Sequence, residues 1–179
     1  MVARGDKTKG WEEAIKAFLL LKRSTDRPVK LILVGWSDYL KKLSEQYTDR
    51  DIIFTGQTDN PLGWIYHFDA GLLPTYFPAE SLPNSIIEYL AMGKPVIATR
   101  WAEIPQMINS PHGKAGIIIN LKNGKADVSQ LYQAMSKYLN DTSLWKKHKH
   151  NTQYAFEKFS MEKCYKSYKT IYKEYMINY

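Results

Sequence analysis

The stretch YFPAESLPNSIIEYLAMGKPVIAT, residues 76–99, decides the fold, because it predicts a loop, a helix and a buried strand in that order. Pro83 suits the first position of a helix, where the N–H that proline lacks would have no partner in any case. Gly93 is expected to end this helix as a left-handed cap, and Pro95 to open the strand that follows. The helix therefore starts in a loop and returns the chain to a sheet.

Further buried strands are expected along residues 1–121, where apolar runs closed by turn residues alternate with helical patterns. Such runs are typical of parallel strands that are covered on both faces. They lie at residues 29–35, 51–56, 70–74, 95–99 and 116–120, and residues 1–3 predict a further short strand. The alternation predicts an α/β fold, a Rossmann-like parallel sheet of about six strands flanked by helices. Ligands are expected outside the carboxyl ends of those strands.

Residues 11–22 predict an amphipathic helix after the first strand. One stripe holds the apolar side chains of Trp11, Ile15, Phe18 and Leu19, and the opposite side holds Glu12, Glu13 and Lys16, which we expect to point into solvent.

Beyond Asn120 the strand pattern stops, and a helical tail is expected. Its three helices are predicted at about residues 127–139, 141–158 and 160–176. We expect one domain over residues 1–179, with an α/β core at 1–121 and the tail at 122–179.

The net positive charge belongs almost entirely to the tail. The chain has 25 Lys and Arg against 18 Asp and Glu, a net charge of +7. Residues 1–121 hold 14 against 13, whereas residues 122–179 hold 11 against 5. Because the basic residues do not gather at the expected ligand end, no nucleic acid partner is predicted.

Cys164 is the only cysteine, which excludes an internal disulfide and a thiolate cage for zinc. The four histidines lack the spacing of metal ligands, so neither a metal site nor a cofactor is expected. No apolar run approaches the roughly 18 residues that a membrane span requires, and the first residues lack the apolar stretch of a signal peptide. The sequence predicts a cytoplasmic protein.

The start of the helix at Pro83 is a predicted anion site, since its first-turn N–H groups are unpaired and the helix dipole is positive there. Asn84, Ser85 and Glu88 share a face near this start. Phosphate is the expected guest. Carboxylates repel phosphate, so Glu80 and Glu88 are better suited to accept hydrogen bonds from sugar hydroxyls. The predicted ligand is a phosphate with sugars on both sides.

This segment resembles a known signature. Glu80-x7-Glu88 followed by Ala-Met-Gly-Lys-Pro-Val-Ile-Ala-Thr is similar to the donor-binding motif in the C-terminal domain of retaining, nucleotide-sugar-dependent glycosyltransferases of the GT-B fold, the glycosyl transferases group 1 family. The resemblance implies that Glu80 contacts the transferred sugar and that Glu88 binds the ribose. It implies that sugar and diphosphate are held by the loop of Ser81, Leu82, Pro83, Asn84 and Ser85.

A second element lies in the loop after the first strand. Arg4 and Lys9 are spaced as in the family's Gly-Arg-x4-Lys-Gly element, with Ala3 where Gly is usual. The pair can neutralise a departing diphosphate without a metal. The resemblance therefore makes Arg4, Lys9 and Glu80 the candidate catalytic residues, while Lys7 is interpreted as a solvated loop residue.

Two other loops follow predicted strands. The resemblance implies that Gln57 lies beside the nucleobase. Trp36 either stacks on a ligand or covers the core, and we favour the core. The chain departs from the family after Thr99. The family usually has a Gly-Gly pair and a Glu there, whereas this chain reads Arg100-Trp101-Ala102-Glu103-Ile104-Pro105-Gln106, so the donor sugar cannot be assigned.

The last predicted helix, residues 160–176, places tyrosines on one side and lysines largely on its flanks. One interpretation is that it packs on its own sheet or on a further domain. The other is that it contacts an anionic membrane surface at the inner face of the membrane. We favour packing.

The resemblance implies a donor-binding domain that serves sugar transfer with retention of configuration, in the biosynthesis of cell-surface polysaccharide or lipopolysaccharide. We expect the N-terminal acceptor-binding domain to lie outside this chain, and the isolated domain to bind the nucleotide sugar without turnover. A nucleotide-sugar epimerase, a phosphorylase and a non-catalytic binding module are the alternatives.

Overall fold

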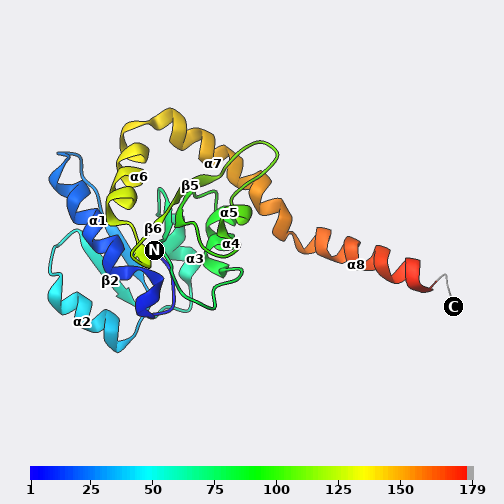
Figure 1. Cartoon of the computed structure of the whole chain (residues 1–179), viewed down its shortest axis with the longest axis horizontal. Coiled ribbons are helices and arrows are strands. Elements are labelled where there is room, and N and C mark those ends of the chain that lie inside the picture. The colour runs from blue at the N-terminus through cyan, green and yellow to red at the C-terminus, as the bar shows by residue number, and fades with distance from the viewer. Residues whose placement is uncertain (177–179) are drawn as a thin grey trace.

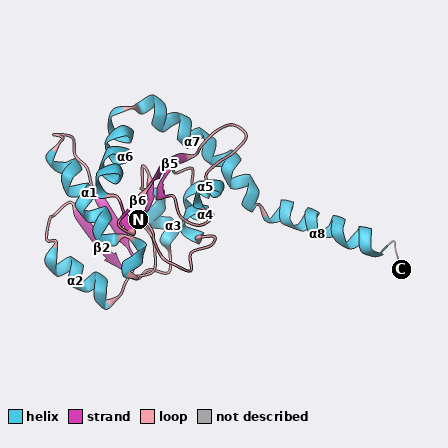
Figure 2. Ribbon diagram, viewed as in Figure 1, coloured by secondary structure: helices cyan, strands magenta, loops and turns pink. Residues whose placement is uncertain are grey.

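The computed structural model describes residues 1–176 and shows helices on both faces of parallel strands (Figures 1 and 2). The strands are β1 (Leu31–Val34), β2 (Ile52–Gly56), β3 (Gly71–Leu73), β4 (Val96–Thr99) and β5 (Gly116–Ile119), followed by β6 (Leu121–Lys122) and β7 (Lys125–Ala126). The helices are α1 (Trp11–Arg23), α2 (Asp38–Gln46), α3 (Pro61–Tyr66), α4 (Asn84–Ala91), α5 (Ile104–Met107), α6 (Val128–Asn140), α7 (Thr142–Phe156) and α8 (Met161–Met176), with short 3₁₀ helices at Lys7–Lys9 and Glu157–Phe159.

The parallel strands form two pieces instead of the continuous sheet that the sequence predicts. One piece pairs β1 with β2, and the other has the order β3-β4-β5. The predicted first strand lies beside β1, but only as a single parallel bridge between Val2 and Val34. The α/β class and the parallel pairing are confirmed, whereas the two pieces are not hydrogen-bonded to each other as one ladder.

Two apolar layers enclose the strands. Alternate residues of a strand point to opposite faces, and β1 shows this plainly, because Leu33 packs in one core and Val34 in the other. The first core joins the strands to α1 and α6, with Trp11 and Leu131 fully buried. The second joins them to α4 and α5 and includes the fully buried Tyr89. Covering on both faces explains the nearly continuous apolar runs of the strands.

One prediction for α1 is wrong. Glu13, expected to point into solvent, is buried at 7% exposure. Its Oε1 accepts a hydrogen bond of 3.3 Å from the hydroxyl of Tyr76, a residue of the loop after β3. The helical pattern places Glu13 on the polar face, but the hydrogen bond from Tyr76 of a distant loop allows this carboxylate to be buried.

The prediction that strands stop after Asn120 is also wrong. β6 and β7 pair antiparallel as a short hairpin. Its turn residues, Asn123 and Gly124, have φ values of 52° and 74°. An Asn-Gly pair with positive φ at both positions is the preferred two-residue hairpin turn, so the signal is present in the sequence.

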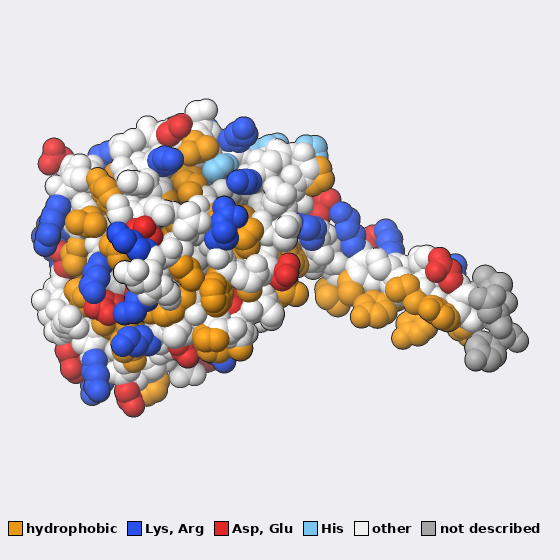
Figure 3. Space-filling view, in the orientation of Figure 1, with side chains coloured by type: hydrophobic (Ala, Val, Ile, Leu, Met, Phe, Trp, Pro, Cys, Tyr) orange, Lys and Arg blue, Asp and Glu red, His pale blue; other side chains and the backbone are white. Residues whose placement is uncertain are grey.

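The helix α8 projects away from the body (Figures 1 and 2). Each of its residues from Met161 to Met176 is exposed. The interpretation that this helix packs on its own sheet is therefore wrong. Its apolar side chains gather along one side in Figure 3, and Tyr165 and Tyr172 are both 64% exposed. Packing on a further domain and contact with an anionic membrane both stay open.

Candidate functional site

Two loops meet at the carboxyl ends of the strands, and a glycine fixes their approach. Gly10 precedes α1 with a φ of +82°, and a Cβ atom there would lie 2.1 Å from the carbonyl oxygen of Pro74. Only glycine fits this combination of left-handed backbone and close contact. The backbone N–H of Tyr76 also donates to the carbonyl of Thr8 at 2.8 Å. The loop at residues 4–10 is therefore fastened to the loop at residues 74–80.

This junction brings Lys9 and Glu80 together, far apart as they are in the sequence. Lys9 Nζ lies 2.7 Å from Glu80 Oε2, and each side chain is only 7% exposed. The same carboxylate oxygen accepts a hydrogen bond of 2.8 Å from the hydroxyl of Thr75, which is fully buried. Two donors thus hold one oxygen of Glu80, and its orientation is set before any ligand binds.

The ring of Phe77 lies against both cations of the site. Lys9 Nζ lies 4.4 Å from the centre of its ring and the guanidinium carbon of Arg4 lies 5.2 Å from it. Both distances are typical of cation–π contacts. The carbonyl of Phe77 accepts a hydrogen bond of 2.7 Å from the indole N–H of Trp101. Arg4 is exposed, so its guanidinium is the cation most open to a ligand.

The structure thus joins Arg4, Lys9 and Glu80, the three residues that the sequence marks as catalytic candidates. It adds Thr75, Phe77 and Trp101, which sequence reasoning missed. A signal for Trp101 exists, because it stands where the chain departs from the family pattern. For Thr75 and Phe77 the only signal is their position in the loop after a buried strand.

The start of α4 leaves its first-turn amides without a side-chain cap. Pro83 is the N-cap residue and not the first helical residue as predicted, with ψ at 117° in the extended region, and its side chain cannot accept a hydrogen bond. Gly93 has the predicted left-handed conformation, with φ at 67°. The open amides and the helix dipole favour an anion here.

The other predicted residues of this loop differ in exposure. Ser81, Leu82 and Asn84 are exposed, Ser85 is partly buried and Pro83 is buried. Three of these side chains are thus accessible from solvent on the segment that joins Glu80 to α4.

Glu88 is partly buried on α4, and this burial raises the pKa of its carboxyl above the ordinary value of 4.5. Gln57 is exposed in the loop after β2. Among the contacts of the described residues, none joins Gln57 or Glu88 to the Lys9–Glu80 pair. Trp36 is 59% exposed, so our preference for a core role is wrong, and the ring is free to stack on a ligand.

Within residues 1–176 no three His, Cys, Asp or Glu side chains are placed together to hold a metal ion. In the same part of the chain, no helix combines the length and apolar character needed to cross a membrane.

Comparison with known proteins adds to this geometry. The family model "Glycosyl transferases group 1" matches residues 1–141. The chain belongs to this family. Its fold is that of the C-terminal domain of GT-B glycosyltransferases, as the solved relatives below show, and the family assignment covers the whole α/β core and the candidate site.

Individual relatives agree. An uncharacterized glycosyltransferase of Methanocaldococcus jannaschii is 27% identical over 183 residues, covering 99% of this chain and 45% of that protein. The structure of HepE from Anabaena in complex with UDP and glucose superposes with a TM-score of 0.68 at 22% identity, covering 87% of this chain and 41% of the other. The C-terminal domain of LpcC from Francisella tularensis, a glycosyl transferase group 1 family protein, gives 0.67 at 21% identity, with coverages of 86% and 79%.

This chain spans less than half the length of the curated relatives that it matches, with coverages of 45%, 42% and 48% of their sequences. It corresponds in extent to one half of such an enzyme.

Proposed function

We propose that this domain binds the donor of a retaining glycosyltransferase, a nucleotide diphosphate sugar. The observation that carries the proposal is the buried Lys9–Glu80 pair, with the exposed Arg4 nearby. The loop that holds Glu80 leads directly to the start of α4, which has no side-chain cap. Cations and open amides suit a diphosphate, and an oriented carboxylate suits sugar hydroxyls.

The chemistry follows from these groups. The bond between the anomeric carbon and the diphosphate oxygen breaks, and a bond to an acceptor hydroxyl forms on the same face of the sugar. Arg4, Lys9 and the amides at the start of α4 stabilise the charge that grows on the leaving diphosphate. Glu80 orients the sugar, and the resemblance implies that the leaving phosphate takes the acceptor's proton. No metal is needed in this scheme.

We infer that the base is uracil. HepE was solved with UDP, and TarM of S. aureus, which superposes with a TM-score of 0.73 at 18% identity, was also solved with UDP. Glu88 then binds the ribose hydroxyls, and Gln57 lies beside the base. A role in polysaccharide or lipopolysaccharide biosynthesis is part of the same proposal.

Calorimetry of the domain with UDP tests the donor site. We expect binding, and Glu88→Ala should weaken it about tenfold or more, the equivalent of about 1.4 kcal/mol. Glu162→Ala, on the exposed helix α8, is the matched control and should leave binding unchanged. Absence of binding at millimolar UDP would overturn the proposal.

Arg4→Ala separates phosphate contacts from nucleoside contacts. Because Arg4 is assigned to the diphosphate, the variant should lose affinity for UDP far more than for uridine. Equal losses for the two ligands would remove Arg4 from the phosphate site.

Alternative activities use similar anion sites. A nucleotide-sugar epimerase would convert the donor without an acceptor, a phosphorylase would require inorganic phosphate, and a binding module would do neither. We propose that the complete protein transfers sugar and that this domain alone binds the donor without turnover. Incubating the domain with UDP-sugars and following free UDP and epimerised sugar by chromatography distinguishes these cases.

We propose that the protein acts in the cytoplasm and that α8 packs on the acceptor-binding half of the complete protein. Its apolar side and its lysines also suit the anionic inner face of a membrane. Sedimentation with vesicles rich in phosphatidylglycerol tests this alternative, and binding by the domain would favour the membrane.

A further inference from the structure

A small pocket lies along the outer edge of β5, where α6 and α7 flank the strand (Figure 1). Its volume is about 270 Å³. Gly116 and Ile118 of β5 contribute to its lining, together with Lys137 of α6 and His148 of α7. None of the residues assigned to the nucleotide-sugar donor lines it, so the pocket is separate from that site.

The edge of β5 presents peptide groups to this pocket. β5 is the outermost strand of its piece of sheet. The carbonyls of Ala115 and Ile119 accept hydrogen bonds of 3.0 and 2.7 Å from the β4 side. In a parallel ladder alternate residues face the same neighbour, so the N–H and C=O groups of Gly116 and Ile118 face outward.

One outward position of this edge already has a side-chain partner. The N–H of Asn120, the next outward residue, donates to Oε1 of Gln130 in α6 at 2.9 Å. In the part of the chain that the structure describes, no such partner meets the N–H of Gly116 or Ile118. A buried peptide N–H is normally paired, and Gly116 is buried, so a ligand is a suitable acceptor here.

The side chains around this edge are basic. The pocket is lined by Arg100, Lys114, Lys137 and His148, and by no Asp or Glu. Within residues 1–176, the ion pairs do not include any of these four side chains. Several cations without a carboxylate partner in one hollow create a local positive potential that attracts an anion.

Two of the cations are anchored by neutral amide groups. Nε of Arg100 donates to Oδ1 of Asn120 at 3.1 Å, which leaves the other guanidinium N–H groups for a ligand. The carbonyl of Lys114 accepts a hydrogen bond of 2.9 Å from the side-chain amide of Asn151, which is buried on α7. These contacts fix where the cations start without neutralising them.

His148 is the partly buried member of the group. Its Nδ1 lies 2.8 Å from the hydroxyl of Tyr138 in α6, a contact that orients the ring and leaves Nε2 for a ligand. Burial and the charges of Lys147 and Lys114 lower the pKa of His148 below its ordinary value of 6.5. Lys137 and Arg100 line the same pocket, and no carboxylate there opposes this effect.

We propose that this pocket binds a phosphate monoester, a small organic molecule with one terminal phosphate. At pH 7 such a phosphate carries close to two negative charges and three acceptor oxygens, which suit several cations and the outward N–H groups of β5. Protonated His148 then donates from Nε2 to the phosphate and from Nδ1 to Tyr138. Leu144 and Ile117 also line the pocket and can pack against the organic part.

Lysines beside an edge strand have a simpler role, because their charge hinders pairing with another chain. That role requires neither a hollow nor an imidazole held at Nδ1. The two interpretations differ in one measurable respect, since only a bound phosphate changes the protonation of His148.

The test follows the imidazole of His148 by NMR during a pH titration, with glycerol 3-phosphate as the probe. Glycerol with sodium chloride at the same ionic strength is the control. We expect the phosphate to raise the pKa of His148, because a nearby anion favours the protonated ring. At constant pH the resonance of His150, exposed on the same helix, should not move. An unchanged pKa of His148 would overturn the proposal.

Paired substitutions locate the binding. Lys114→Gln with Lys137→Gln should raise the Kd for glycerol 3-phosphate about tenfold, since each lysine lies at the pocket. Lys41→Gln with Lys146→Gln removes the same charge from exposed positions outside the pocket and should change the Kd less than about twofold. Equal weakening by the two pairs would mean attraction to the whole basic surface and would also overturn the proposal. The readout is one imidazole outside the donor site, so the result does not depend on UDP binding.

Discussion

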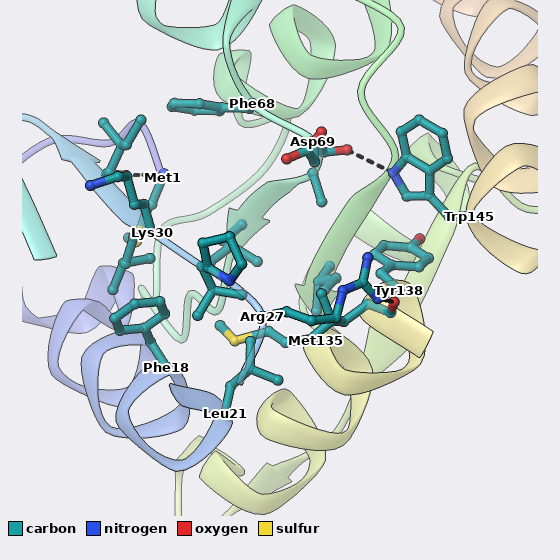
Figure 4. Close-up of a pocket in the computed structure, with 18 of the residues that line it drawn as sticks. Met1, Phe18, Leu21, Arg27, Lys30, Phe68, Asp69, Met135, Tyr138 and Trp145 are labelled. Atoms are coloured by element: carbon teal, nitrogen blue, oxygen red, sulfur yellow. Dashed lines mark hydrogen bonds between the residues drawn. The ribbon is translucent and has the colours of Figure 1, made fainter. Parts of the chain in front are cut away.

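The two ends of the parallel strands are built in different ways. At the carboxyl ends, loops that are distant in sequence are fastened together: Ser37 Oγ donates to the carbonyl of Gly5 at 2.7 Å, and the N–H of Tyr76 donates to Thr8. At the amino ends, β1 and β3 stand apart on either side of a groove lined by apolar side chains and by Arg27, Lys30, His67 and Asp69 (Figure 4).

The two ends therefore differ in how their strands and loops are held together. The carboxyl end is held by the buried Lys9–Glu80 ion pair and by hydrogen bonds between its loops, so these side chains are in position before any ligand binds. The amino end joins its two sheet pieces through the hydroxyl of Tyr89, which accepts from the N–H of Val2 and donates to the carbonyl of Leu72. Substitutions that break the contacts at the carboxyl end should therefore mostly cost stability.

The largest loss is expected from breaking the Lys9–Glu80 pair. Lys9→Met leaves a carboxylate buried without its cation and should destabilise the domain by about 3 kcal/mol, because an unpaired buried charge is costly. Urea denaturation measures this. Glu80→Gln added to Lys9→Met should recover part of the loss, since the charge then disappears.

The control for that prediction is an exposed ion pair. Lys166 Nζ lies 2.6 Å from Glu162 Oε1, and the two side chains are 70% and 73% exposed. Lys166→Met should therefore change the free energy of unfolding by less than about 0.5 kcal/mol. Similar losses of stability for Lys9→Met and Lys166→Met would mean that the buried ion pair stabilises the domain no more than the exposed pair on α8 does.

The second largest loss is expected at Gly10, which fastens the two loops. Gly10→Ala introduces a Cβ atom 2.1 Å from the carbonyl oxygen of Pro74, and it should cost at least about 2 kcal/mol. Gly124→Ala is the matched control, because φ is also positive there, at +74°, but nothing lies within 4 Å of the added atom. It should cost only about 1 kcal/mol in thermal denaturation. Equal costs would show that the loop at Pro74 moves away freely.

The sequence predicted the order of the elements well, because buried parallel strands and amphipathic helices leave local patterns. It also placed Lys9 and Glu80 at the same end of the sheet, since loops after parallel strands meet there. It could not predict that Lys9 pairs directly with Glu80 or that Thr75 donates to the same carboxylate oxygen. Nor could it predict the burial of Glu13 beside Tyr76, because these contacts depend on how distant loops are placed. Trp36 was misjudged because a loop residue carries no periodicity that indicates burial.

A small gain is expected at the carboxyl end, at Ala102 in the loop after β4. Its φ of 46° is left-handed, which strains any residue with a Cβ atom. Ala102→Gly should relieve that strain, less the extra freedom of glycine in the unfolded chain, for a net gain of about 0.5 kcal/mol. Asn123→Gly, at φ 52°, is the control and should gain less, because Asn tolerates this region. A loss of Tm for Ala102→Gly would show that the loop is not strained.

The smallest effect concerns Glu88, whose partial burial raises its pKa. In the folded protein this carboxyl holds its proton to higher pH than in the unfolded chain, so stability falls as pH rises through the window above 4.5. Glu88→Gln removes this penalty and should stabilise the domain at pH 7 by only about 0.3 kcal/mol, since solvent screens the group. At pH 4 the gain should vanish.

Binding of UDP should weaken in the same variant, because a neutral amide makes weaker hydrogen bonds to ribose hydroxyls than a carboxylate does. Urea denaturation at the two pH values, with calorimetry at pH 7, measures both effects. A variant that is stabilised but binds UDP normally would mean that the partly buried charge of Glu88 serves neither the fold nor the nucleotide. If Glu88→Gln gains stability but loses UDP affinity, the carboxylate of Glu88 destabilises the fold slightly and contributes to nucleotide binding.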